Sequence, residues 1–146
     1  MKLFSLLALG ALFAPAALAQ RAVIGAPQDG TTVHPGQNLT VEIDRPDSLT
    51  GSTEVAVVIG FFSCGSSPAA TCPPPTDVLG SVLYNGPYDP EFHTGVSRPP
   101  HQNFTVTVPP FAPAGKAQLG VAHLSLVGAG QFPLFETLNV TLKVEV

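Results

Sequence analysis

The residues with the most evident chemistry are two cysteines, Cys64 and Cys72, at the end of an apolar run. The segment between them is rich in glycine, serine and proline, and two cysteines so close in a secreted chain are typical of one disulfide. A redox site more usually has two residues between its cysteines, and a structural zinc site needs two further ligands. We therefore predict a disulfide staple, which the chain-entropy model values at roughly 2.5 kcal/mol.

A second group of reactive side chains lies in the segment YDPEFH. Asp89, Glu91 and His93 stand at every second position, which places them on one side of an extended segment, and His101 follows nearby. Two histidines and two carboxylates could hold zinc or a non-haem metal. A solvated polar loop is the commoner outcome where prolines interrupt the segment, so we predict no metal and no cofactor, with the metal site as the alternative.

Evidence for catalysis is weak elsewhere in the sequence. His123 lies in an apolar segment, where a core histidine bonded to a backbone carbonyl is commoner than a catalytic base, since a base needs a nucleophile nearby. The segment GFFSCG has one residue too many before its serine for a nucleophile elbow. Nothing nominates a carboxylate pair for glycoside hydrolysis, and no glycine-rich phosphate loop follows a strand. We predict that the protein is not an enzyme.

Alternation of apolar and polar residues predicts the strands that position these side chains. The run 55–62 is apolar on both parities, as in a central strand covered on both sides, and Gly60 marks a candidate bulge there. No window shows an amphipathic helical repeat. About seven short strands separated by glycine- and proline-rich turns indicate an all-β, immunoglobulin-like antiparallel β-sandwich. The other predicted strands are 22–25, 39–43, 78–84, 104–108, 117–127 and 138–146.

The amino-terminal residues 1–19 have the order of a secretory signal: a lysine, a short apolar run and a small-x-small cleavage pattern ending at Ala19. Cleavage there leaves residues 20–146, a length typical of one domain. No later segment approaches the roughly 18 apolar residues of a membrane span. The formal net charge of −4 is spread along the chain, which argues against nucleic acid and anionic membranes as partners. We expect a secreted single-domain protein.

Three N-glycosylation acceptors, Asn38, Asn103 and Asn139, each begin an Asn-x-Thr motif. The middle residue of each motif belongs to the apolar set of its predicted strand. Because side chains alternate across a strand, the asparagine and threonine should face solvent. We therefore predict that faces of the sheets carry glycans and that the loops are the accessible protein surface.

Several segments taken together resemble a known family: DSLTGSTEVAVVIGFFSCG, LGSVLYNGPYDP, QNFTVTVPPFAPAGKAQLGVAHLSLVGAG and PLFETLNVTLKVEV. In this order they are similar to the necrosis-inducing secreted protein family of fungal effectors. The resemblance implies a protein that dampens plant pattern-triggered immunity by binding immune co-receptor kinases and the cytoplasmic kinases below them. Reaching those kinase domains would require translocation into the host cell. The resemblance supplies a role and no contact residues.

Two loops, 64–76 and 85–101, are the longest predicted, and loops on a rigid scaffold commonly carry recognition. The alternative function is a non-catalytic module for cell-wall polysaccharide, in which aromatic rings of the second loop region stack on sugars. The candidate partner-binding residues there are Tyr84, Tyr88, Asp89, Phe92 and His93.

Overall fold

The computed structural model describes residues 21–47, 50–95 and 97–146, and these residues form β-strands joined by turns and loops. The signal peptide predicted for residues 1–19 lies outside the described residues. Every strand predicted from the alternation overlaps one in the structure, and one further short strand, β2, was not predicted. The strands are β1 (Val23–Ala26), β2 (Thr31–Val33), β3 (Asn38–Asp44), β4 (Ser52–Gly65), β5 (Ser81–Gly86), β6 (His101–Thr107), β7 (Gly115–Val127) and β8 (Phe132–Val144).

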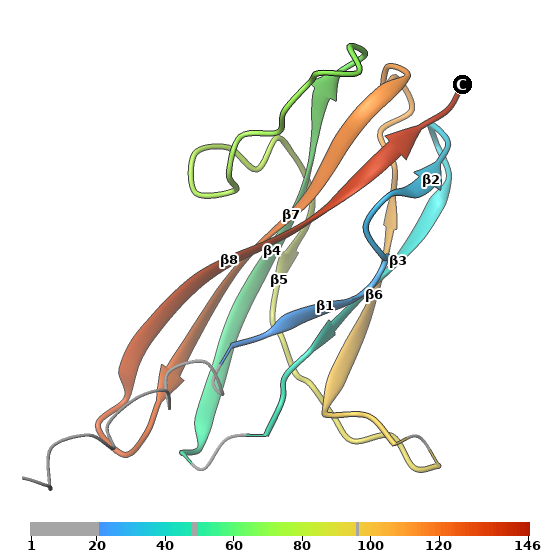
Figure 1. Cartoon of the computed structure of the whole chain (residues 1–146). Coiled ribbons are helices and arrows are strands. Elements are labelled where there is room, and N and C mark those ends of the chain that lie inside the picture. The colour runs from blue at the N-terminus through green and yellow to red at the C-terminus, as the bar shows by residue number, and fades with distance from the viewer. Residues whose placement is uncertain (1–20, 48–49, 96) are drawn as a thin grey trace, which may run out of the picture.

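The strands form two sheets that pack face to face, in the orders β1-β3-β6 and β2-β8-β7-β4-β5 (Figure 1). The first two strands divide between the sheets: β1 pairs antiparallel with β3, whereas β2 pairs parallel with β8. An immunoglobulin-like sandwich has these sheet orders, and its first two strands divide between the sheets as β1 and β2 do here. The predicted fold class is therefore confirmed. The parallel β2–β8 pair corrects the expectation that all pairs are antiparallel.

The core follows from the alternation, because every second side chain of the central strands points between the sheets. Val41 and Ile43 of β3 and Val57 and Ile59 of β4 are fully buried. β-Branched residues suit these positions because they pack closely on a pleated surface. The other buried apolar strand residues are Val33, Leu39, Phe61, Phe104, Val106, Ala117, Leu119, Val121, Val127, Val140, Leu142 and Val144.

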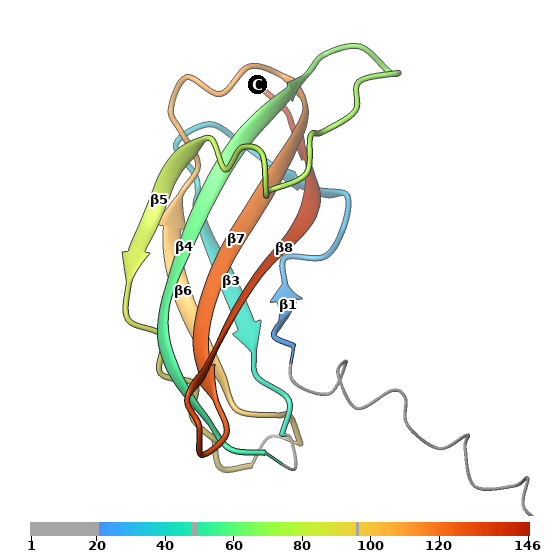
Figure 2. The ribbon, with the colours of Figure 1, turned by 90° about the vertical axis from the view of Figure 1, so that its left-hand side faces the viewer.

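The outer face of the larger sheet is covered in part by the disulfide loop, residues 66–80 (Figure 2). Gly60 and Gly120 are register partners, and a Cβ added at either one would collide with Leu79. Gln118 of β7 donates a hydrogen bond to the Pro73 carbonyl at 3.0 Å. The central strand is therefore covered on both sides, and a register shift against β5 falls at Gly60, as predicted. The predicted disulfide is present.

Antiparallel pairing places the connections of the sandwich at two opposite ends. The β3–β4, β5–β6 and β7–β8 connections lie together at one end (Figure 1). We call this the loop end and define it by the described residues 45–47, 50–51, 87–95, 97–100 and 128–131. The disulfide loop and the β6–β7 connection lie at the other end. The two long loops predicted as partner-binding segments are therefore separated by the length of the sandwich.

Candidate interaction surface

The loop end contains a hollow of about 390 Å³ between the β3–β4 connection and residues 88–90. Arg45 and Glu54 both line it, and their side chains form an ion pair with Nε and Oε1 2.8 Å apart. Both side chains are largely buried, so the pair lies in the wall of the hollow and little of it reaches bulk solvent. The volume of the hollow is near the lower limit of the roughly 300–1,000 Å³ typical of ligand pockets.

Glu54 reaches this position because β4 contains a bulge. The register of β4 against β7 shifts between Glu54 and Ala56, so Glu54 lies opposite Ser125 on the core side of the sheet. Val55, the extra residue, is left 41% exposed on the surface. A bulge re-aims the side chains that precede it, and here it turns a carboxylate into the interior.

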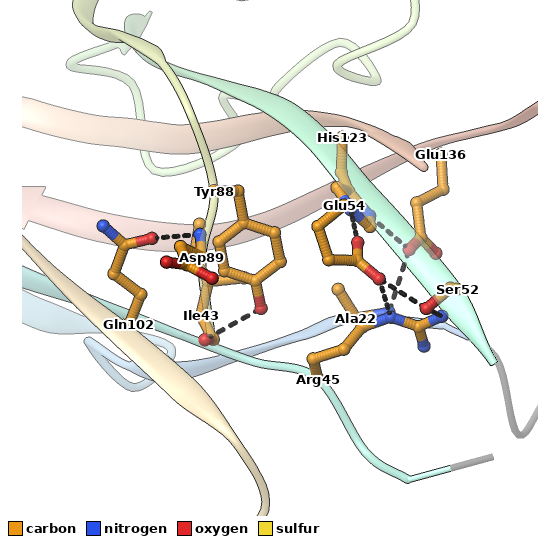
Figure 3. A network of polar contacts seen from close by, with 10 residues as sticks. All are labelled: Ala22, Ile43, Arg45, Ser52, Glu54, Tyr88, Asp89, Gln102, His123 and Glu136. Atoms are coloured by element: carbon orange, nitrogen blue, oxygen red, sulfur yellow. Dashed lines mark hydrogen bonds and ion pairs between the residues drawn. The ribbon is translucent and has the colours of Figure 1, made fainter. Parts of the chain in front are cut away.

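Behind the hollow lies a buried cluster centred on His123 (Figure 3). The ring is fully buried, with Nε2 2.5 Å from Glu54 Oε2 and Nδ1 2.9 Å from Glu136 Oε1. The backbone N–H of Ala22 donates to the same Glu136 oxygen at 2.8 Å. The core location of His123 was predicted correctly. The predicted backbone-carbonyl partner was wrong, because two carboxylates from neighbouring strands take its ring nitrogens.

The opposite charges of the cluster compensate one another. Each ring nitrogen of His123 faces a carboxylate oxygen, so both must donate, and the arrangement favours the doubly protonated ring. Burial opposes that charge, but the hydrogen bonds with Glu136 and Glu54 outweigh it and raise the pKa of His123 above its ordinary value. Burial likewise opposes ionisation of Glu54, yet hydrogen bonds from His123, Ser52 and Arg45 lower its pKa to about 2. The cations Arg45 and His123 thus balance the carboxylates Glu54 and Glu136 in the interior.

This pairing also limits the chemistry of His123. A general base needs a nitrogen free to accept a proton from a substrate group within hydrogen-bond reach. Both nitrogens of His123 are engaged with carboxylates, and the ring is closed off from solvent. The cluster therefore acts as a structural link between β4, β7 and β8, with Arg45 extending it to the smaller sheet.

Two of the predicted contact residues lie in the interior or against it. Tyr88 is only 2% exposed, and its hydroxyl donates to the Ile43 carbonyl at 3.1 Å, so the structure places its ring in the core and not on the surface. Burial raises the pKa of this phenol, and the nearby Glu54 charge adds to the effect. Tyr84 is half-buried, with its ring centroid 4.6 Å from that of Phe104. Both rings therefore pack against the interior of the sandwich.

The other three predicted contact residues are exposed. Phe92 is 67% exposed, and Asp89 and His93 line a second hollow, also of about 390 Å³, beside β6. The rings of His93 and His101 lie with centroids 4.4 Å apart, and His101 Nδ1 donates to a backbone carbonyl. In the part of the chain that the structure describes, no three His, Cys, Asp or Glu side chains converge as metal ligands.

Further exposed apolar side chains were missed by the sequence interpretation. Phe132 is 68% and Phe135 64% exposed at the start of β8. The sequence feature that could have indicated their exposure is their position directly after a glycine-rich turn. Residues at the start of such a strand lie outside the core. Phe111, 94% exposed, lies in the β6–β7 connection at the opposite end.

These features define a class of protein: an immunoglobulin-like scaffold that presents loops, a hollow and exposed aromatic side chains at one end. The chain belongs to the Nis1 family, whose model matches residues 17–143. This is an effector-like family of necrosis-inducing secreted proteins of fungi, so the protein is of the fungal effector type. The family and the disulfide are both consistent with secretion. No helix in the described residues is long and apolar enough to cross a membrane.

No curated protein matches the sequence. Among solved structures, the CooA pilin subunit from enterotoxigenic Escherichia coli is similar over 86% of this chain and 99% of its own. The identity is 12% and the TM-score 0.31.

Proposed function

We propose that the protein is a non-catalytic secreted effector that suppresses plant pattern-triggered immunity by binding host immune receptor-associated kinases. The observation that carries this proposal is the Nis1 family match across residues 17–143. A binding role also suits the chemistry of the interior, because the fully buried His123 is held by two carboxylates. Inhibition by covering a kinase surface requires no reaction from the effector.

The loop end is the surface that we assign to the kinase. Asn38 and Asn103 are exposed on the outer face of the smaller sheet, and Asn139 is exposed on that of the larger sheet. Glycans at these asparagines would cover both outer faces. The loop end carries Phe92, and Phe132 follows the loop end directly as the first residue of β8; both are more than 60% exposed. Large aromatic side chains are the commonest anchors of protein interfaces, and a hollow beside them can receive a partner side chain.

The alternative, a polysaccharide-binding module, receives less support from the geometry. It relied on the rings of Tyr84, Tyr88 and Phe92 as a platform for sugar stacking. Tyr88 is buried and Tyr84 packs against Phe104, which leaves Phe92 as the exposed ring of the three. A single exposed ring does not form a platform for a chain of sugars.

The binding test uses residues 20–146 and the purified cytoplasmic domain of the flagellin co-receptor kinase, with affinity measured by biolayer interferometry. The double variant F92S/F132S should bind at least tenfold more weakly, since each lost anchor typically costs about 1–2 kcal/mol and 1.4 kcal/mol is tenfold. F111S is the matched control, because it removes a ring that is even more exposed, at the opposite end.

Absence of any complex with folded wild-type protein would contradict the kinase proposal. An equal effect of F111S and the double variant would contradict the assignment to the loop end. Retention of the protein on insoluble chitin, glucan or cellulose without kinase binding would favour the alternative.

A further inference from the structure

The hollow beside β6 is built by a segment that the β5–β6 loop adds to the edge of the smaller sheet. The Glu91 N–H donates to the His101 carbonyl at 3.2 Å, and the His101 N–H donates back to the Glu91 carbonyl at 3.0 Å. The Asp89 N–H donates to Gln102 Oε1 at 2.7 Å. An antiparallel bridge between Glu91 and His101, together with the Asp89 bond, therefore holds this segment against the edge strand β6.

The side chains around this hollow form an uncommon set for a surface loop. Its lining residues are Asp89, Glu91, His93, His101, Gln102 and Asn103. Two carboxylates supply strong hydrogen-bond acceptors, and the exposed imidazole of His93, which packs against the tilted ring of His101, supplies a flat face. At about 390 Å³ the hollow suits a monosaccharide better than a longer chain.

Asn103 is the lining residue that connects this hollow to a glycan. It is exposed on β6, and Thr105, two residues on, is exposed on the same face, as an Asn-x-Thr acceptor requires. The other two acceptors differ, because neither lines this hollow or the one at the loop end. Asn38 accepts a hydrogen bond from Thr107, and Asn139 donates one to Gln118.

We propose that Asn103 is N-glycosylated and that the first N-acetylglucosamine of its glycan occupies the hollow lined by Asp89, Glu91 and His93. In the attachment step, the Asn103 amide nitrogen forms a bond to C1 of the sugar and loses a proton. The donor is a lipid diphosphate-linked oligosaccharide of the secretory pathway, and its lipid diphosphate leaves. The attached sugar stacks its C–H face on the imidazole of His93. The carboxylates of Asp89 and Glu91 accept hydrogen bonds from its hydroxyl groups.

This site changes the role of Asp89 and His93, which the sequence suggested as partner contacts, and gives a role to Glu91, which it suggested only as a metal ligand. Asp89, Glu91 and His93 hold the protein's own glycan, which pins the 89–93 segment against β6. The exposed ring of Phe92 remains available to a partner. The proposal is independent of the kinase function, since it concerns the folding and stability of the secreted protein itself.

The test uses residues 20–146 secreted from a yeast that adds N-glycans, in an N38Q/N139Q background that leaves Asn103 as the one acceptor motif. Glycopeptide mass spectrometry measures its occupancy. Endoglycosidase H then trims the glycan to one N-acetylglucosamine. This form should melt at least about 3 °C above the T105A form, which keeps Asn103 but carries no sugar. The H93A variant should abolish most of that difference.

A direct readout of the contact is the nuclear Overhauser effect between sugar protons and the His93 ring in the trimmed protein. We expect it in the wild-type site and not at Asn38 or Asn139 in protein that carries those glycans. An unglycosylated Asn103 would overturn the proposal. So would equal melting temperatures of the trimmed and T105A forms, or a stabilisation that H93A leaves intact.

Discussion

Replacing His123 by glutamine should destabilise the protein, because this side chain holds two buried carboxylates together. Glutamine can donate to Glu54 or Glu136 but cannot neutralise either charge, so at least one buried carboxylate is left without its partner. Breaking a buried ion pair by removing one partner typically costs about 3–5 kcal/mol. For a domain of this length, 1 kcal/mol corresponds to about 3–5 °C, so the melting temperature should fall by about 10–20 °C.

The same cluster predicts how stability depends on pH. The pKa of His123 is raised above 6.5 in the folded state, so its contribution is complete below pH 6.5 and is lost as the pH rises through the raised value. The pKa of Glu54 is lowered from 4.5 to about 2, so its contribution is complete above pH 4.5 and is lost as the pH falls toward 2. Stability should therefore be greatest between about pH 4.5 and 6.5, the mildly acidic range.

The assay is urea unfolding of the wild-type protein and H123Q at a series of pH values. The wild-type protein should lose stability on the alkaline side, and H123Q should not show that loss. H34Q is the matched control, because His34 is exposed and its Nδ1 bonds a single backbone carbonyl. A cost below about 1 kcal/mol for H123Q, or an alkaline loss that persists in that variant, would refute the account of the cluster.

Three further changes test other parts of the structure. C64S/C72S should cost roughly 2.5 kcal/mol in urea unfolding and leave the protein folded, and complete unfolding would contradict this estimate. G60A should displace the disulfide loop from the sheet and increase its cleavage in limited proteolysis, whereas G51A, which meets open space, should not. Y88F removes a buried hydroxyl donor and should lower the free energy of unfolding by about 1 kcal/mol without weakening kinase binding. Weaker binding by Y88F would show that Tyr88 contacts the kinase.

The strands that alternate cleanly could be predicted from the sequence. In β3, β6 and β8 the apolar residues keep one parity over at least five positions, which specifies both the strand and its buried face. β2 has three residues directly before a His-Pro pair, too few for any period to appear. Its parallel partner β8 lies more than 100 residues away, so pairing is decided by tertiary structure.

The buried cluster could be predicted only in part. Glu136 shares its parity with Leu138, Val140 and Leu142, and a carboxylate on the buried parity of a strand is a readable signal for a buried partner. Glu54 gave no such signal, because the bulge at Val55 shifts the parity of β4. The loop end, for its part, is assembled from connections that only the topology brings together.

The central claim is that the loop end of this protein suppresses plant immunity, and the most direct measurement is the reactive-oxygen burst that a flagellin peptide triggers in leaves. Residues 20–146 would be expressed as wild type, F92S/F132S and F111S, with equal accumulation confirmed. We predict that the wild type and F111S suppress the burst and that F92S/F132S does not. An unchanged burst in leaves that accumulate the wild-type protein would contradict the claim.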